Sequence, residues 1–211
     1  MKKFRKPSDI KVGVIGYGGS FNMGKHHLTE MKRAGMTPVA VAEIDPDRLK
    51  VAAADFPGIQ TYNSVSQMLK KSDVNLVTLI TPHNTHAGLA IQCLNAGRHV
   101  VCEKPLAITP SELDEIAAAL EALKNVPQPP LLMVGFNRRF APLAVRLFDF
   151  LSSRNEPLVA HYRVNAGYIP LSHWTQDPQQ GGGRIIGEAC HFIDFLTFLI
   201  GQPPLSVTAH A

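Results

Sequence analysis

The chain has 211 residues, of which 45% are hydrophobic and 18% are charged, as in ordinary folded globular proteins. This composition excludes an intrinsically disordered chain, and no apolar run approaches the roughly 20 residues of a membrane-spanning helix. The basic start is followed by Pro7-Ser8-Asp9 and not by the apolar core of a signal peptide. We therefore expect a cytoplasmic protein with no membrane partner.

The net charge of +4 belongs to the start of the chain and not to a nucleic-acid-binding surface. Without Lys2, Lys3, Arg5 and Lys6, the 21 basic side chains fall to the number of the acidic ones, which is 17. No basic stripe interleaved with aromatic residues remains to follow a phosphate backbone, so we expect no nucleic-acid partner. The three cysteines are far apart and form no CxxC pair, which indicates neither a disulfide framework nor a zinc site.

The first part of the chain alternates short apolar segments with amphipathic ones. Strands are predicted at residues 10–16, 38–43, 75–81, 99–102 and 131–136, with a brief one at 59–62. Helices are predicted at 24–34, 46–55, 85–95 and 111–124, and residues 63–71 form another amphipathic stretch. The helix at 111–124 is expected to open with the capping pattern Ser111 to Asp114. Strands that alternate with helices in this way predict a parallel sheet covered on both faces.

The pattern changes after residue 136. Helices are predicted at 140–151 and 184–200, strands at 158–165 and 205–211, and a long loop rich in Gly, Pro and Gln at 166–183. We therefore expect two domains, residues 1–136 and residues 137–211.

A glycine-rich segment follows the first predicted strand and opens the first helix. Glycines allow a tight turn, and the free N–H groups at a helix start bind phosphate oxygens, so we expect a dinucleotide pyrophosphate here. Phe21 occupies the third position of the G-x-G-x-x-G spacing and Gly24 comes late, which predicts a lengthened loop. A purely structural glycine turn is the alternative. The candidate cofactor-binding residues of this loop are Gly16, Gly18, Gly19, Ser20 and Phe21.

Glu43 ends the second predicted strand, at the place where a carboxylate would bind the adenosine ribose hydroxyls. A carboxylate there repels a 2′-phosphate, so we expect NAD, with NADP the less favoured cofactor. The alternative is a solvated carboxylate, with Asp45 as the cap of the next helix.

Two polar segments follow the third and fourth long strands. They are Thr81-Pro-His-Asn-Thr-His86 and Cys102-Glu-Lys-Pro105. Because the carboxyl ends of parallel strands meet at one edge of a sheet, both segments are expected at the edge where ligands bind.

These segments, with Asn137-Arg-Arg-Phe140 and the three glycines 181–183 ahead of His191, resemble the glucose-fructose oxidoreductase, inositol dehydrogenase and MocA-like family. The resemblance implies an α/β fold: an N-terminal Rossmann doubly wound parallel sheet, then an incomplete α+β domain that begins an open, mostly antiparallel sheet. It also implies an NAD(P)-dependent oxidoreductase that acts on a carbinol carbon of a sugar, a polyol or a sugar derivative.

The resemblance makes Lys104 a principal catalytic residue, because its ammonium can stabilise alkoxide charge and assist proton transfer. His191 matches the family histidine that contacts the reacting hydroxyl and acts as its acid or base. The family often has Asp four residues before this histidine, but this chain has Gly187 there. Glu188 is expected to substitute for that Asp in part. The reason is that helical spacing places Glu188, His191 and Asp194 on one face of the helix. Glu188-x-x-His191 is also half of a di-iron motif, but the second half is missing and we expect no metal.

Other residues are expected to contact cofactor or substrate. Glu103 would orient Lys104 or cap the turn, and an arginine of the 137–140 segment would bind substrate oxygens or pack at a domain junction. His26 and His27 are expected to be surface or packing residues. Further cofactor contacts are assigned to Thr81, Pro82, His83, His86, Glu103, Lys104 and Asn137, and substrate contacts to Arg139, Tyr168, Trp174 and His191.

Family members are considerably longer than this chain. A chain that stops within the second sheet would leave an exposed strand edge, which favours association, so we expect a homo-oligomer. Two alternatives to the enzyme are a truncated nucleotide-binding homologue without turnover and a purely structural partner in an assembly.

Overall fold

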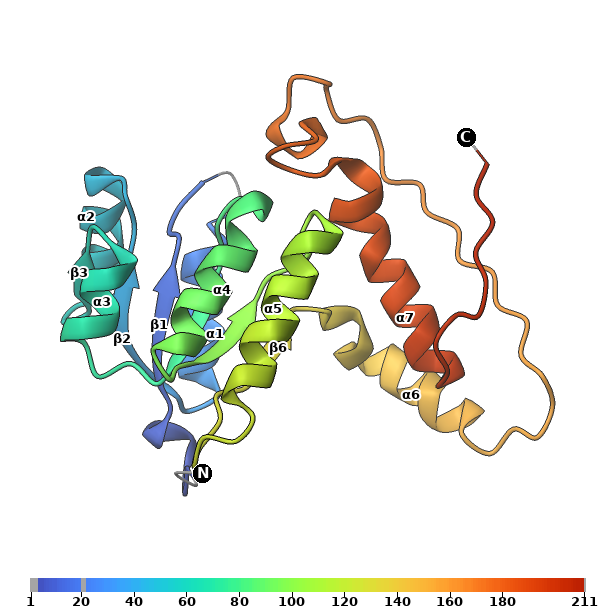
Figure 1. Cartoon of the computed structure of the whole chain (residues 1–211), viewed down its shortest axis with the longest axis horizontal. Helices are drawn as coiled ribbons and strands as arrows, with labels where there is room; N and C mark the ends of the chain where they lie inside the picture. The colour runs from blue at the N-terminus through green and yellow to red at the C-terminus, as the bar shows by residue number, and fades with distance from the viewer. Residues whose placement is uncertain (1–3, 20–21, 211) are drawn as a thin grey trace. The chain divides into compact units, whose positions relative to one another are not determined.

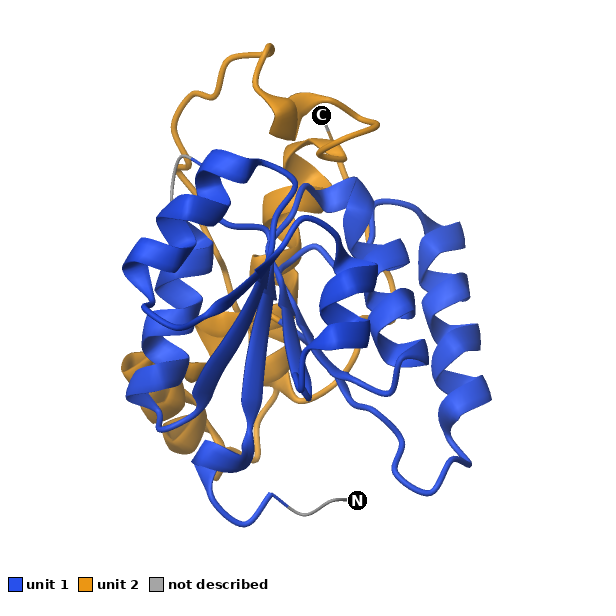
Figure 2. Ribbon diagram, turned by 90° about the vertical axis from the view of Figure 1, so that its left-hand side faces the viewer, with its two compact units in different colours: residues 1–134 blue, residues 135–211 orange. Residues whose placement is uncertain are grey.

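The computed structural model describes residues 4–19 and 22–210, and the chain divides into two compact units, Met1–Val134 and Gly135–Ala211 (Figure 2). The first unit contains every strand that the described residues form. The second unit consists of helices joined by long segments without regular structure (Figure 1).

A six-stranded parallel sheet is the centre of the first unit. Its order, β3-β2-β1-β4-β5-β6, is that of a doubly wound Rossmann sheet, which confirms the predicted fold class. From β1 the strands are added first on one side (β2, β3) and then on the other (β4, β5, β6), so the strand order reverses between β1 and β4. Such sheets bind ligands at the carboxyl ends of the strands beside this point. The strands are β1 (Lys11–Ile15), β2 (Thr37–Ala42), β3 (Gln60–Tyr62), β4 (Leu76–Leu79), β5 (His99–Cys102) and β6 (Leu132–Val134).

Helices cover both faces of this sheet, as the alternating sequence pattern predicts. Side chains of α1 and α2 pack with Val12, Val14 and Val41 on one face. Side chains of α3, α4 and α5 form a larger core with Val77 and Val100 on the other face. The helices are α1 (Met23–Arg33), α2 (Pro46–Asp55), α3 (Val65–Lys71), α4 (His86–Asn95) and α5 (Pro110–Leu123).

The start of α5 differs from the prediction. The cap is Thr109, whose hydroxyl accepts the Glu112 N–H at 3.2 Å, while the Glu112 carboxylate accepts the Thr109 N–H at 3.0 Å. The expected cap from Ser111 to Asp114 is therefore wrong. Pro110 explains the difference: proline fits the first turn of a helix, so the helix begins at Pro110 and the capping box precedes the predicted one by two residues.

The second unit is built around two helices, α6 (Pro142–Leu151) and α7 (Cys190–Ile200). Phe148 of α6 stacks on Phe198 of α7, with ring centroids 4.6 Å apart. Arg154 donates to the carbonyl of Ile200 at 3.0 Å and so caps the last turn of α7. A π-helical turn, Ile185–Ala189, precedes α7, so the helix predicted at 184–200 begins with wider turns than an α-helix.

The strands predicted at 158–165 and 205–211 are wrong for the residues that the structure describes there. Alternating apolar residues form a strand only where another strand supplies hydrogen bonds and a covering face. Neither segment has such a partner, and Val159 is accordingly 94% exposed.

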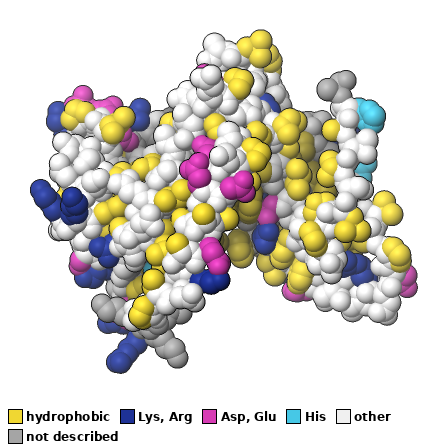
Figure 3. All heavy atoms as spheres, in the orientation of Figure 1, with side chains coloured by type: hydrophobic (Ala, Val, Ile, Leu, Met, Phe, Trp, Pro, Cys, Tyr) yellow, Lys and Arg dark blue, Asp and Glu magenta, His cyan; other side chains and the backbone are white. Residues whose placement is uncertain are grey.

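Many apolar side chains of the second unit are exposed, as the yellow surface in Figure 3 illustrates. They include Leu143 and Phe150 of α6 and Ile193 of α7.

In the described part of the chain, none of the helices has both the length and the apolar character that crossing a membrane requires.

Candidate functional site

The glycine loop connects β1 to α1 with a backbone that only glycine accommodates. Gly16 has φ +93°, and a Cβ at this position would lie 2.5 Å from the carbonyl oxygen of Ile80. A Cβ on Gly24 would lie 2.8 Å from the carbonyl oxygen of Gly16, so glycine there lets α1 approach the loop closely. Gly24 thus has the packing role of the third glycine in the dinucleotide fingerprint, although it comes late in the sequence.

The loop leads into the N-terminus of α1, where free N–H groups favour an anion. Asn22 caps this helix by accepting the Lys25 N–H at 3.3 Å. Gly18 and Gly19 also have positive φ angles. The other two candidate residues of the loop, Ser20 and Phe21, lie outside the described residues.

Glu43 fastens the glycine loop to the end of β2. Its carboxylate accepts three backbone N–H groups: that of Tyr17 at 2.7 Å, that of Ile44 at 2.7 Å and that of Asp45 at 3.1 Å. The residue is only 8% exposed, so the alternative of a solvated carboxylate is wrong. Asp45 does cap α2, as expected, by accepting the Asp47 N–H at 2.9 Å.

Tyr17 anchors the same loop on its other side. Its hydroxyl donates to Asp55 at 2.7 Å, and Lys25 binds the second oxygen of that carboxylate at 2.6 Å. Burial, with the bond and charge of Asp55, raises the pKa of Tyr17 far above its ordinary value. The tyrosine is therefore a neutral structural donor.

The turn after β4 carries the predicted Thr-Pro-x-x-x-His residues. The hydroxyls of Thr81 and Thr85 are 2.6 Å apart, and Thr85 also donates to the carbonyl of Pro82 at 2.7 Å. His83, in a 3₁₀ turn (His83–Thr85), is buried, with its ring centroid 5.8 Å from that of His86. These bonds fix the turn directly before α4.

His86 is the first residue of α4 and is only 1% exposed. Its Nδ1 lies 2.7 Å from the carbonyl oxygen of Pro105, and its Nε2 lies 2.9 Å from that of Thr81. Burial lowers the pKa of His86, opposed by the two carbonyls and the charge of Glu103. The imidazole therefore joins the turn after β4 to the segment after β5.

Glu103 follows β5 and extends its ladder by donating its N–H to the carbonyl of Leu79 at 3.0 Å. Its Oε1 is 2.7 Å from Nε2 of His27, and its Oε2 accepts the Lys104 N–H at 3.4 Å. Burial alone would raise the pKa of Glu103, but the bond and charge of His27, with the amide and ammonium of Lys104, hold it below its ordinary value. Glu103 is thus an ionised carboxylate directly before Lys104.

His27 is the polar partner that sequence reasoning missed. A lone histidine in a helix carries no motif, and the expectation of a surface or packing role did not include its contact with Glu103. A usable signal was its spacing: His27 lies three residues after Gly24 and one before the buried Leu28, which puts it near the sheet-facing side of α1.

His191 lies in the first turn of α7 and is buried. Its ring meets that of Phe136 edge to face, with centroids 6.1 Å apart. Asn137 and the two arginines after it form a short 3₁₀ helix (Asn137–Phe140).

Arg139 holds the buried carboxylate of Asp194 with two bonds: its Nε donates to Oδ2 at 2.7 Å and its Nη2 to Oδ1. The bond to Asp194 raises the pKa of Arg139. The guanidinium of Arg138 lies over the ring of Phe192, 4.9 Å from its centroid. Residues 136–139 therefore contact the beginning of α7, which carries His191.

Glu188 lies in the π-helical turn before α7, while Gly187, the position where the family often has Asp, is buried. The spacing of an α-helix relates His191 to Asp194, but a π turn is wider and does not give Glu188 the same relation. His191 and Asp194 therefore keep the predicted α-helical spacing, and the predicted relation of the Glu188 side chain to His191 stays a prediction.

The aromatic residues of the long loop differ in their surroundings. Tyr168 is 85% exposed. Trp174, in a 3₁₀ turn (Trp174–Gln176), has its ring centroid 6.0 Å from that of His173.

Within the described ranges, no group of three or more His, Cys, Asp or Glu side chains is arranged to hold a metal ion.

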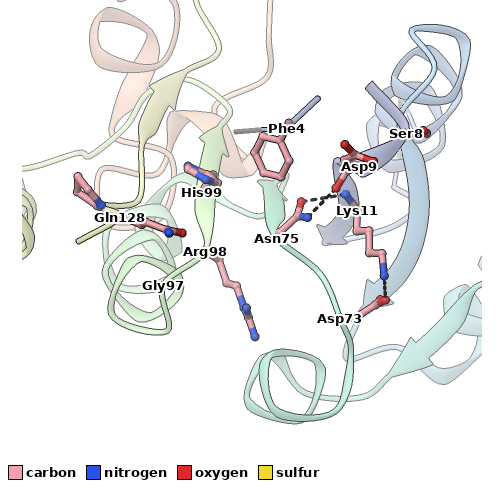
Figure 4. A pocket seen from close by; sticks show the side chains of 11 residues that line it. Phe4, Ser8, Asp9, Lys11, Asp73, Asn75, Gly97, Arg98, His99 and Gln128 are labelled. Carbon is pink, nitrogen blue, oxygen red and sulfur yellow. Dashed lines mark hydrogen bonds and ion pairs between the residues drawn. The ribbon is translucent and has the colours of Figure 1, made fainter. Parts of the chain in front are cut away.

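A separate hollow of about 660 Å³ opens at the opposite edge of the sheet (Figure 4). It lies at the amino ends of β1, β4 and β5, beside Lys11, Asn75 and His99. Asn75 accepts the Lys11 N–H at 2.8 Å and donates to the carbonyl of Asp9 at 2.9 Å, and Lys11 pairs with Asp73. None of the candidate site residues that the structure describes lines this hollow.

The Rossmann strand order, the glycine loop against α1 and the acidic residue after β2 define a dinucleotide-binding α/β protein. Residues 10–129 match the "Oxidoreductase family, NAD-binding Rossmann fold", and residues 156–211 match the "Oxidoreductase family, C-terminal alpha/beta domain". The chain belongs to the glucose-fructose oxidoreductase, inositol dehydrogenase and MocA family.

Individual relatives agree with this family. Inositol 2-dehydrogenase 2 of Paenarthrobacter aurescens is 34% identical over 207 residues, which are 96% of this chain and 59% of the relative. The scyllo-inositol 2-dehydrogenase (NADP(+)) of Bacillus subtilis is 27% identical over 213 residues, covering 100% of this chain and 57% of the relative. An oxidoreductase domain protein from Kribbella flavida superposes with a TM-score of 0.76 at 29% identity, over 90% of this chain and 52% of that structure. The chain thus spans little more than half the length of these relatives.

Proposed function

We propose that this protein is an NAD-dependent oxidoreductase that transfers hydride between the nicotinamide and a carbinol or carbonyl carbon of a polyol, a sugar or a sugar derivative. The observation that carries the proposal is the position of Lys104. It follows β5 at the carboxyl edge of the sheet that carries the glycine loop after β1, beside the point where the strand order reverses. The two inositol dehydrogenases reported above favour a cyclic polyol as substrate.

The residues present fit a dinucleotide. Glycine at position 16 and at position 24 leaves the loop backbone free of side chains where a pyrophosphate must approach the N-terminus of α1. Gly18, Gly19, Ser20 and Phe21 complete the proposed phosphate loop. NAD, when bound, supplies the hydride acceptor for the reaction.

Glu43 supports NAD over NADP. Three N–H groups bind its carboxylate. Among the described residues, Oε2 accepts only the N–H of Tyr17, so this oxygen can accept a further hydrogen bond from a ribose hydroxyl. A 2′-phosphate would meet a fixed negative charge instead. Since one relative is named as an NADP(+) enzyme, both cofactors belong in the test.

The remaining residues receive roles by the same proposal. Lys104 stabilises the charge that develops on the substrate oxygen, and His191 exchanges the hydroxyl proton, with Glu188 as its acidic neighbour. Thr81, Pro82, His83 and Asn137 contact the cofactor, and Arg139, Tyr168 and Trp174 contact the substrate. Because Arg139 already binds Asp194 through two nitrogens, its remaining nitrogen is the group proposed for substrate. His86 and Glu103 act at the cofactor edge through the segments that they hold.

The test begins with calorimetric titration of NAD, NADH, NADP and NADPH, followed by NADH formation with inositols and sugars. Micromolar NAD binding and turnover with a polyol support the proposal. Absence of dinucleotide binding in a folded sample contradicts it. A cytoplasmic location and a homo-oligomer stay predictions, which fractionation and light scattering check.

One observation favours a second candidate, a nucleotide-binding homologue without turnover. Gly187 stands where the family often has Asp, and the π turn gives Glu188 a different relation to His191. The same assays distinguish the two, because this homologue binds NAD and forms no NADH with any substrate.

A further inference from the structure

Both chain neighbours of Lys104 are held by histidines from different helices. Glu103 binds Nε2 of His27, on α1, at 2.7 Å. The carbonyl oxygen of Pro105 lies 2.7 Å from Nδ1 of His86, on α4. The backbone of Lys104 is therefore fixed on one side by the helix that follows the glycine loop and on the other by the helix that follows β4.

The His27 side reaches Lys104 itself through Glu103. One oxygen of the Glu103 carboxylate accepts from His27, and the other accepts the Lys104 N–H at 3.4 Å. Two separate oxygens of one carboxylate thus join an imidazole of α1 to the backbone of Lys104. The side chains of His27 and Glu103 are partly buried, with 20% and 22% of their surface exposed, which reduces the competition of water for these bonds.

The His86 side is anchored to the sheet edge. Nε2 of His86 lies 2.9 Å from the carbonyl oxygen of Thr81, the residue that begins the turn after β4. The ring therefore spans the ends of two neighbouring strands.

We propose that His27 is a positioning residue for Lys104: it fixes the Glu103 carboxylate, which fixes the Lys104 backbone, while His86 fixes the opposite side. The catalytic consequence rests on the proposed function, in which Lys104 acts on the substrate oxygen. Since α1 begins at the proposed phosphate loop, this contact also links the cofactor-binding helix to Lys104.

His26 provides a matched control because it is the adjacent residue of the same helix and is exposed. His27→Leu keeps side-chain volume and removes the donor. His27→Gln replaces Nε2 by an amide nitrogen and is the conservative variant. His26→Leu makes the same change in charge and polarity without touching Glu103.

The first measurement is amide hydrogen exchange by NMR on the full chain, which does not depend on turnover. His27→Leu is expected to speed exchange at the Lys104 amide about tenfold, because its acceptor is no longer held, while the Glu103 amide, bound to Leu79, keeps its rate. His27→Gln restores much of the protection, and His26→Leu changes nothing. Unchanged exchange at Lys104 in His27→Leu, or faster exchange throughout the first unit, overturns the proposal.

The second measurement separates kcat from KM. A displaced catalytic group lowers the rate of the chemical step by about ten- to a hundredfold, so His27→Leu is expected to lower kcat while KM for NAD stays within about twofold. An unchanged kcat beside a loosened Lys104 amide contradicts the positioning role. If the unsubstituted chain forms no NADH at all, the proposed function fails, and amide exchange alone decides whether His27 fixes Lys104.

Discussion

The carboxylate of Glu43 accepts the backbone N–H of Tyr17 at 2.7 Å, across 26 positions of sequence. This bond joins the residue directly after β2 to the glycine loop that follows β1. It gives Glu43 a structural role in addition to the proposed contact with ribose. The loop and the acid that are expected to select the cofactor therefore form one hydrogen-bonded unit.

Glu43→Gln tests this connection. The amide nitrogen of glutamine would face N–H donors where the carboxylate accepted them, so buried donors lose their partner at a cost of about 2 kcal/mol. We expect a lower free energy of unfolding in urea and weaker NAD binding by calorimetry. Asp47→Asn is the control, because that carboxylate is exposed and pairs only with Lys50 in the described structure. Equal effects of the two substitutions would contradict the role of Glu43.

Gly16→Ala tests the loop backbone. The new Cβ would lie 2.5 Å from the Ile80 carbonyl oxygen, in a residue with φ +93°. Gly58→Ala is matched, since Gly58 has φ +88° but no described residue other than its chain neighbours lies within 4 Å of the new Cβ. Positive φ alone is expected to lower the free energy of unfolding by about 1 kcal/mol, so Gly58→Ala loses that much and keeps NAD binding. Gly16→Ala is expected to lower the free energy of unfolding by clearly more than Gly58→Ala does, and to abolish NAD binding. If urea unfolding gave equal losses for the two variants, the clash with the Ile80 carbonyl would be absent.

The pair of Arg139 and Asp194 makes a prediction for the second unit. Asp194 is buried, but Arg139 is partly exposed, so solvent screening reduces the value of the pair. We expect a coupling free energy of about 1 kcal/mol from a double-mutant cycle of Arg139→Leu and Asp194→Leu, measured by urea unfolding. Arg139→Lys should recover little, because an ammonium cannot make the two-nitrogen contact. Additive single effects would mean that the pair does not couple.

Glu103 makes stability depend on pH. Its folded pKa is held below the ordinary value of 4.5, so the ionised form stabilises the fold at neutral pH. In acid the unfolded chain binds the proton first, and this contribution is lost as pH falls from about 4.5 through the lower folded pKa. We therefore compare the free energy of unfolding of the unsubstituted chain with that of Glu103→Gln. The difference between them should decrease as the pH falls through this range. A difference that stays constant or grows in acid would have the wrong sign.

The fold of the first unit could be predicted because its signals are local. Apolar strands such as 75–81 and capped helices such as α2 follow from side-chain period and turn chemistry, which do not depend on distant residues. The exact cap of α5 was missed because two overlapping capping patterns compete and the proline decides between them.

The second unit and the polar contacts of the site depend on distant partners. The strand predicted at 158–165 lacks a neighbour to pair with, which no pattern within the segment reveals. Glu103 was expected to orient Lys104 or cap a turn, but its partner His27 lies 76 positions earlier in the chain. Arg139 likewise gave no sign of Asp194, which is 55 positions away.

The most direct test compares the unsubstituted chain with Lys104→Ala. NADH formation from NAD is measured with a panel of inositols and sugars, and NAD binding of both proteins is measured by calorimetry. We predict that the unsubstituted chain binds NAD and turns over a polyol. Lys104→Ala should bind NAD with similar affinity and lose about 10²-fold to 10⁴-fold in kcat. A Lys104→Ala protein that keeps its turnover, or an unsubstituted chain that binds NAD and oxidises none of these compounds, would contradict this prediction.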